Sequence, residues 1–339
     1  MDGDAGGIRF GLFGSAEARR SASGDPARGF REFIDTSIEA EQLGFYSTFL
    51  VEHHFTGLGQ VSASLDLLSW VASRTTEMRV GTAVIVLPWH DPVLLAERTA
   101  TLDLLSSGRL DFGVGKGYRH SEFTGFCVPL EEAEARFDEC LAVILKAWTS
   151  DEPFSHDGRF WRYKEIVVEP PTAQKPHPPV WIAAGRPASI RKVAALGANL
   201  MLDQFASTDS IGERLSLFKA ECEGCGRAVD SMEVAVARNL YVARDEADAR
   251  EALSRQAKIH DRMIELSRGP DDSNASHIMA YADTPGETEA HALFGTPERI
   301  IGELEALRAV GTRYVLLNTS RQSMRRFAAD VMPALISSG

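Results

Sequence analysis

The sequence predicts a (β/α)8 TIM barrel, the α/β fold in which eight parallel strands alternate with helices. Short apolar segments alternate with amphipathic ones along the whole chain, which is the pattern of repeated βα units. The length of 339 residues exceeds the usual size of one domain but suits such a barrel. No shift in composition divides the chain, so we expect a single domain over residues 1–339, with a flexible leader at residues 1–7.

Each predicted strand is a short apolar segment that ends at a polar or glycine-containing turn. Segment 79–87 is nearly all apolar, as expected for a parallel strand that is buried on both faces. In chain order, the predicted strands are 8–14, 45–51, 79–87, 110–114, 180–184, 199–203, one within 233–243, and 313–317.

Each predicted helix carries apolar residues at helical spacing. Gly44 and Gly197 follow two of them as stop signals, and Pro92 suits the first turn of another. The predicted helices are 28–43, 63–74, 92–107, 130–148, 188–196, 210–223, one starting near 245, 296–310 and 324–336. Two polar, irregular stretches interrupt the pattern near 154–179 and 265–294, and we interpret them as excursions from the barrel.

An open, doubly wound sheet is the rival fold. It would bind its ligand at one switch point, so candidate ligand residues would follow only a few strands. Here polar or glycine-rich turns follow the second, fourth, fifth and sixth predicted strands. That spread favours the barrel, whose active site is built from many strand ends.

The net charge of −12 and the pI near 5.3 argue against a nucleic-acid partner, which needs clustered cations. No apolar run approaches the ~20 residues of a membrane span. The N-terminus lacks the basic and apolar regions of a signal peptide, so we expect a cytoplasmic protein with no membrane partner.

The cysteines are too few for a disulfide scaffold. Cys222 and Cys225 have the spacing of a redox or zinc pair, but no second pair follows at zinc spacing. They lie at the end of a predicted helix beside Gly224 and Gly226, which favours a helix end, and we expect no metal site.

Three ionisable residues, Glu52, His53 and His54, follow the second predicted strand directly. In a β/α barrel, the ends of the strands and the loops after them build the active site. We therefore take these three as candidate catalytic residues. The alternative is a polar strand end that packs against its own loop.

Two later turns suit an anion. Glycines surround Lys116 in segment 113–118, and glycine lets a backbone approach an anion closely. Segment 184–189 joins the fifth strand to a helix, whose first N–H groups form a natural phosphate site. The alternatives are a tight barrel turn for the first and an ordinary capped helix start for the second.

Five segments form a recognisable set: EHHFT (52–56), VGTAVIVLP (80–88), ERTATLDLLSSGRLDFGVGKG (97–117), PVWIAA (179–184) and GTPE (295–298). Together they resemble the bacterial luciferase-like flavin monooxygenases. The resemblance covers nearly the whole chain and is most specific between Val51 and Gly117. It implies the same (β/α)8 barrel and a luciferase-like domain.

The resemblance implies that reduced FMN binds at the C-terminal face of the barrel. Oxygen would add to it to give a flavin 4a-hydroperoxide, which oxygenates an organic substrate. His53 matches the catalytic histidine, and Glu52 and His54 match its neighbours. The implied flavin-binding residues are Ala83, Val84, Lys116, Gly117, Tyr118, Arg136, Ala184, Gly185, Arg186 and Ser189.

Within this set, Lys116 falls where luciferase has a phosphate-binding arginine, and segment 184–189 matches a second phosphate-binding segment. Arg136 matches a further phosphate contact. The resemblance also implies a non-proline cis peptide between Ala83 and Val84. Gly115 replaces the reactive cysteine of luciferase, so light emission gains no support.

The expected partners are a small-molecule substrate, O2 and a separate flavin reductase, because no NAD-binding fingerprint is present. Aromatic residues in the loops suggest an apolar or ring-bearing substrate. We also expect a homodimer, formed through apolar faces of helices 63–74 and 92–107. Two alternatives remain: a deazaflavin (coenzyme F420)-dependent hydride-transfer oxidoreductase, and a flavin-binding protein without turnover.

Overall fold

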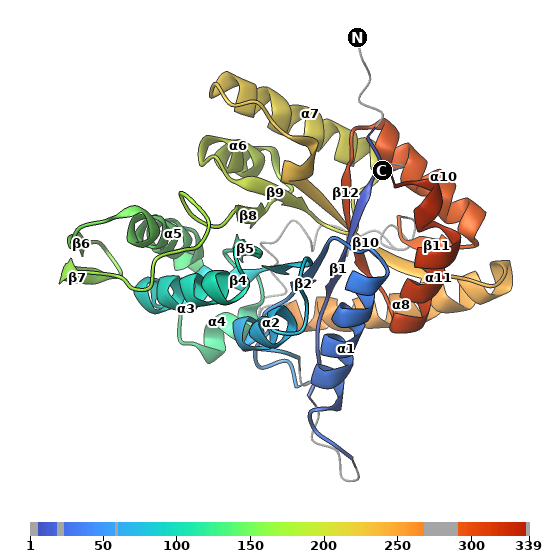
Figure 1. Ribbon diagram of the computed structural model, residues 1–339, viewed down its shortest axis with the longest axis horizontal. Coiled ribbons are helices and arrows are strands. Elements are labelled where there is room, and N and C mark those ends of the chain that lie inside the picture. Colours follow the sequence, from blue (N-terminus) through green and yellow to red (C-terminus); the bar gives the residue numbers. More distant parts are fainter. Residues whose placement is uncertain (1–5, 19–23, 58–59, 268–290, 337–339) are drawn as a thin grey trace.

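The structure is a computed structural model, which describes residues 6–18, 24–57, 60–267 and 291–336. Eight parallel strands close into a barrel, so the predicted fold class is confirmed (Figure 1). Pairing runs β1-β2-β3-β5-β8-β9-β10-β12, and β12 pairs with β1 to close the ring. The strands are β1 (Arg9–Gly14), β2 (Ser47–Leu50), β3 (Arg79–Thr82), β4 (Ile85–Val86), β5 (Leu110–Gly115), β6 (Phe154–Asp157), β7 (Arg162–Ile166), β8 (Val180–Ala183), β9 (Asn199–Leu202), β10 (Val234–Val242), β11 (Leu293–Gly295) and β12 (Tyr314–Asn318).

Helices surround the barrel and cover the outer faces of its strands (Figure 1). Capping residues fix several of their starts. Asp91 accepts hydrogen bonds from the first N–H groups of α3, with Pro92 as its first residue, and Ser207 and Ser320 cap α7 and α11. The helices are α1 (Arg28–Gln42), α2 (Ser64–Ala72), α3 (Pro92–Leu105), α4 (His120–Gly125), α5 (Ala133–Thr149), α6 (Pro187–Ala195), α7 (Thr208–Gly224), α8 (Glu246–Ser267), α10 (Pro297–Ala309) and α11 (Arg321–Asp330).

The predicted strand 79–87 is wrong as one continuous strand. β3 ends at Thr82, a cis peptide joins Ala83 to Val84, and only β4 continues before a 3-10 helix at Leu87–Trp89. The Thr82 hydroxyl donates to the carbonyl of Gly113 (2.7 Å) and accepts from its N–H (2.9 Å). The Thr82 side chain thus bridges to β5 between the backbone pairing of β3 and that of β4, which apolar patterning cannot reveal.

Other differences lie at element ends and in the connections. The helix predicted from 130 begins at Ala133 after a 3-10 turn, and the last helix begins at Arg321 and ends at Asp330, followed by another 3-10 turn. Helix α4 and strand β11 were not predicted, because both are short. The excursion 154–179 contains the antiparallel β6–β7 hairpin, which lies beside α5 at the edge of the molecule (Figure 1).

The predicted excursion 265–294 falls largely outside the described residues, as does most of the predicted leader 1–7. The single-domain organisation stays a prediction. No helix in the described ranges combines the length and apolarity needed to span a membrane. The cytoplasmic location is likewise a prediction from the N-terminal sequence.

Aromatic side chains fill the inside of the barrel. Phe49 contacts Trp181 edge-to-face, with ring centroids 6.1 Å apart, and Tyr314 lies 5.8 Å from Trp181. Gly81 makes room for this cluster, because a Cβ there would lie 2.4 Å from the Phe49 ring. The interior is therefore a packed core, and space for a ligand is left only at the barrel ends.

A substitution at Gly113 on β5 can test how closely β3 and β5 approach each other. A Cβ at this position would lie 1.7 Å from the carbonyl oxygen of Thr82. Since backbone cannot move aside cheaply, Gly113→Ala should lower the free energy of unfolding by at least about 2 kcal/mol, measured by urea denaturation. The control is Gly302→Ala on α10, where nothing lies within 4 Å, and it should stabilise by up to about 1 kcal/mol. Equal effects of the two substitutions would contradict this account of the barrel.

Candidate active site

The predicted catalytic residues lie at the C-terminal end of the barrel. β2 ends at Leu50, so Glu52, His53 and His54 are already in the loop, free of the side-to-side alternation of a strand. Glu52 is buried at 2% exposure, whereas the two histidines are partly exposed. The three neighbours therefore face different surroundings and have different partners.

Glu52 is a buried acceptor at the centre of a hydrogen-bond network. Its Oε1 accepts from His54 Nε2 (2.8 Å), His90 Nε2 (2.8 Å) and Trp89 Nε1 (3.1 Å). Its Oε2 accepts from the backbone N–H of Val86 (2.9 Å). One carboxylate thereby joins the loop after β2 to the chain that follows β4.

This network explains the ionisation of Glu52. Burial alone would raise its pKa, but the hydrogen bonds from His54 and His90 outweigh burial and lower the pKa from 4.5 to about 2. Glu52 is therefore ionised at neutral pH. With its lone pairs already engaged, it is placed to hold its neighbours rather than to exchange a proton.

His53 has a separate partner, Glu122 of α4. The His53 Nδ1 lies 3.1 Å from Glu122 Oε1, which also accepts the N–H of His54 (2.9 Å). Glu122 is itself buried, with a side chain only 2% exposed. A neutral His53 that donates from Nδ1 keeps Nε2 as the ring nitrogen that can accept a proton.

The surroundings of His53 favour its neutral form. Burial lowers the pKa of His53, the positive charge of Arg119 lowers it further, and Glu122 opposes both effects without reversing them. Arg119 is buried at 1% exposure, 3.9 Å from Glu122. A neutral imidazole with a fixed tautomer can act as a general base at neutral pH.

Aromatic rings form a wall beside these histidines. Trp89 stacks on Phe126 with centroids 5.0 Å apart, and His54 meets Phe126 edge-on at 4.7 Å. Phe123 packs on Trp89 and is fully buried. Phe55, at 58% exposure, completes the wall on its solvent side. The wall is apolar, and Trp89 connects it to the Glu52 network through its hydrogen bond to Glu52.

Lys116 follows β5, as predicted, and its ammonium group lies 2.7 Å from Glu134 Oε2 on α5. The other oxygen of Glu134 accepts from Lys192 of α6, which also contacts Asp138 (2.5 Å). These contacts bring the turn after β5 and the helix after β8 to the same place. Both predicted phosphate turns therefore lie on one side of the barrel mouth.

The turn 184–189 opens helix α6. Ala184 and Gly185 are buried, Arg186 is the exposed N-cap residue, and Pro187 is the first helical residue. No side chain caps the first N–H groups of α6. Those groups, which include the N–H of the half-buried Ser189, can accept an anion at the positive end of the helix.

Arg136 is not brought to this place by any contact among the described residues. Its guanidinium pairs with Glu132 one turn away (2.8 Å) and lies 4.4 Å from the centre of the Phe160 ring, next to the β6–β7 hairpin. Its predicted phosphate contact therefore has no geometric support and stays a prediction.

The remaining predicted flavin residues line the end of β5. The cis peptide Ala83–Val84 implied by the resemblance is present. Position 115 requires glycine because the Val84 side chain packs against it: a Cβ on residue 115 would lie 2.6 Å from Val84 Cγ2. Gly117 has a φ of +76°, which favours glycine, and Tyr118 is half-buried after it.

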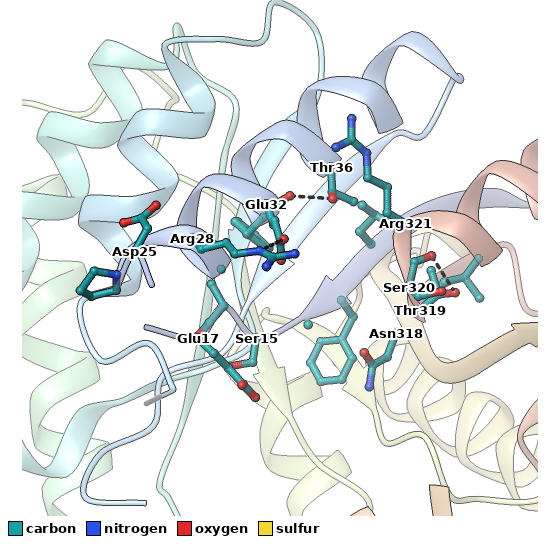
Figure 2. A pocket seen from close by; sticks show the side chains of 18 of the residues that line it. Ser15, Glu17, Asp25, Arg28, Glu32, Thr36, Asn318, Thr319, Ser320 and Arg321 are labelled. Carbon is teal, nitrogen blue, oxygen red and sulfur yellow. Dashed lines mark hydrogen bonds and ion pairs between the residues drawn. The ribbon is translucent and has the colours of Figure 1, made fainter. Parts of the chain in front are cut away.

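A cleft of about 860 Å³ opens at the C-terminal ends of β1 and β12, between α1 and α11 (Figure 2). Arg28 and Glu32 of α1 form an ion pair beside it (2.7 Å), and Asn318 stands at its rim. Its wall at Ala16 is linked to the site through Val61, which bonds both Ala16 and His53. The cleft contains none of the predicted flavin residues.

Residues 8–314 match the sequence model of a family described as luciferase-like monooxygenase. The chain belongs to the luciferase-like monooxygenase family. The family that the five segments indicated is thereby confirmed.

Relatives of this luciferase-like chain include two monooxygenases and one F420-dependent dehydrogenase. The oxygenase component of the flavin-dependent trigonelline monooxygenase of Acinetobacter baylyi is 26% identical over 98% of this chain and 96% of that protein. The crystal structure of monooxygenase RslO1 from Streptomyces bottropensis has a TM-score of 0.81 at 26% identity, covering 96% of this chain and 99% of that one. An F420-dependent glucose-6-phosphate dehydrogenase of Intrasporangium calvum is 25% identical over 91% of this chain and 95% of that protein.

A further match is shorter. An uncharacterized protein of Sinorhizobium fredii is 32% identical over 68% of this chain, and the match spans 66% of that protein's length. The similar proteins are thus named for different activities.

Sequence reasoning missed Glu122, Arg119, Trp89 and His90. Trp89 and His90 carried a usable signal, because they follow the end of a predicted strand just as Glu52 does. Glu122 carried none: it lies in α4, a six-residue helix too short to show a periodic pattern. Contact between residues 53 and 122 is decided by the closing of the barrel.

Because of the Glu52 network, we expect the free energy of unfolding of this luciferase-like chain to fall in acid. A carboxylate whose folded pKa is depressed stabilises the fold above its unfolded pKa, and this stability is lost as pH falls towards the folded pKa. With pKa values of 4.5 and about 2, Glu52 should account for about 2 kcal/mol of lost unfolding free energy between pH 5 and pH 3.

Urea denaturation of Glu52→Gln at both pH values should show that much less pH dependence than the wild type. Glu131→Gln, which removes an exposed carboxylate, is the control and should keep the wild-type dependence. An unchanged pH dependence in Glu52→Gln would show that Glu52 is not the anchor described above.

Proposed function

We propose that this protein is an FMN-dependent monooxygenase that uses reduced flavin, supplied by a separate reductase, and O2 to oxygenate a small organic substrate. The observation that carries the proposal is the His53–Glu122 pair at the C-terminal barrel end, in a chain of the luciferase-like family. Reduced flavin supplies the electrons that activate O2, and the protein supplies binding, orientation and proton transfer.

In this proposal His53 is the proton-transfer group. Glu122 holds its Nδ1–H, and Nε2 accepts a proton from the substrate or the reacting oxygen. Burial and Arg119 keep the imidazole neutral, so it is a base at neutral pH. Glu52 and His54 act as positioning residues, since Glu52 fixes His54 and His90 through hydrogen bonds.

The phosphate of the flavin is proposed to lie between the turn after β5 and the start of α6. Lys116 and the uncapped N–H groups of α6 fit a phosphate, because both present positive charge to one place. Arg186 and Ser189 lie at the same helix start. The glycines at 115 and 117 let the flavin approach the backbone beside Ala83 and Val84.

The aromatic wall supports an apolar or ring-bearing substrate. Trp89, Phe126 and Phe55 lie beside His54, and such rings recognise flat apolar molecules by stacking. We therefore propose a substrate of this class.

A deazaflavin-dependent oxidoreductase is the second candidate, because one relative over 91% of this chain is an F420-dependent dehydrogenase. The two are separated by anaerobic titration with reduced FMN and reduced deazaflavin. They are separated further by turnover in ¹⁸O2 with a flavin reductase and a panel of ring-bearing acceptors. We expect reduced FMN to bind and product to carry one ¹⁸O atom. Deazaflavin binding with oxygen-independent reduction of a substrate would replace our proposal.

His53→Ala should cut oxygenated product by at least ~10²-fold while flavin affinity stays within a few-fold, because a general acid–base group typically contributes ~10²–10⁴-fold. Product by mass spectrometry and binding by fluorescence titration measure the two effects. His156→Ala on the β6–β7 hairpin is the matched control and should retain activity.

Glu122→Gln should shift the pH profile of product formation. Full activity of His53→Ala would remove His53 from the mechanism.

We also propose a homodimer through helices α2 and α3, where the sequence analysis placed it. Of the apolar side chains on which that expectation rested, Leu65, Leu68 and Leu102 are buried within their own barrel flank, whereas Leu105 is 68% exposed. The same helices also expose Trp70 at 64% and Leu94 at 61%. Exposed patches of this kind mark association surfaces.

Sedimentation at micromolar concentration should therefore show a dimer. The double variant Trp70→Glu and Leu105→Glu should be monomeric, since buried unpaired charge opposes association. Leu196→Glu, at an exposed leucine next to α6, should remain dimeric. A monomeric wild type would refute the dimer.

A further inference from the structure

Glu134 occupies an unusual place for an acidic residue, between the two lysines nearest to the proposed phosphate site. Its Oε2 lies 2.7 Å from Lys116 Nζ, and its Oε1 accepts from Lys192. These three residues come from α5, from the turn after β5 and from α6. The carboxylate thus already fills the position at which an anion would meet both ammonium groups.

The charged side chains at this place are partly exposed to solvent. The side chains of Lys116, Glu134 and Lys192 are 55%, 51% and 35% exposed. Although burial alone would raise it, the hydrogen bonds from the two lysines lower the pKa of Glu134, so its carboxylate is charged at neutral pH. Exposed pairs of this kind contribute only ~0–1 kcal/mol to stability, so the fold does not depend on them.

Other anionic groups can take the place of Glu134 as partners of the two lysines. Asp138, one turn further along α5, already pairs with Lys192 at 2.5 Å. A phosphate monoester carries close to two negative charges at pH 7 and three acceptor oxygens, which makes it a stronger partner for Lys116 than one carboxylate.

We propose that Glu134 is an internal competitor of the flavin phosphate: it neutralises Lys116 and Lys192 in the free protein and must release Lys116 when a phosphorylated flavin binds. The inference rests on the proposed function, since it places the FMN phosphate at Lys116. Glu134 thereby lowers the affinity for FMN through its phosphate, while the binding of the flavin ring is unchanged. A moderate affinity suits an oxygenase that receives its flavin from another protein and returns it.

The test measures the dissociation constants of reduced FMN and reduced riboflavin, which differ only by the phosphate, for the full-length protein under anaerobic conditions. Glu134→Gln should tighten reduced FMN about three- to tenfold, on the range expected for two partly exposed ion pairs, and leave riboflavin unchanged. The gain should shrink in high salt because screening weakens exposed charges. Lys116→Ala should weaken FMN and leave riboflavin unchanged.

Glu131→Gln is the matched control. It removes the same charge one turn before Glu134, at a glutamate with no ion pair within the described part of the chain, and should change FMN affinity less than about twofold. Equal gains in Glu131→Gln and Glu134→Gln would overturn the inference, because net charge alone would then explain them.

The inference and the proposed function fail in different ways. If Lys116→Ala weakens FMN but Glu134→Gln does not tighten it, Glu134 is no competitor and the function stands. If the wild type binds deazaflavin but neither form of FMN, the proposed function fails, and the inference about the FMN phosphate fails with it.

Discussion

The site depends on one buried carboxylate. Glu52 accepts four hydrogen bonds, from two imidazoles, an indole and a backbone N–H, and these donors come from two separate loops of the barrel mouth. Burying a charge is costly unless hydrogen bonds satisfy it, and these donors together keep the carboxylate ionised. This requirement fixes the position of the loop that carries His53 and of the chain that follows β4.

His53 and Glu52 thus have different tasks although they are adjacent in sequence. Glu52 is saturated by fixed donors, while His53 has one partner, Glu122, on Nδ1 and keeps Nε2 as the group that can take a proton. The difference arises from surroundings and not from residue type. Arg119 and burial keep His53 neutral, which is the state a general base requires.

Charged side chains gather at a second place in the barrel mouth. The turn after β5 and the start of α6 meet through Glu134, which contacts both Lys116 and Lys192. In the proposed function, proton transfer falls to His53 and anion binding to the turn that carries Lys116, so different loops of the barrel mouth carry the two tasks. A flavin has the same division, with a reactive ring at one end and a phosphate at the other, and this match is what the proposed function uses.

The sequence by itself determined the barrel, because βα alternation and glycine- or proline-marked ends depend on local patterning. It also placed Glu52, His53, His54 and Lys116 at strand ends, where a parallel barrel gathers its site. The tertiary structure alone decided which partners they have. Glu122 is 69 residues from His53, and Glu134 is 18 from Lys116. Such contacts arise only when the barrel closes, since no local periodicity encodes the distance between loops of different strands.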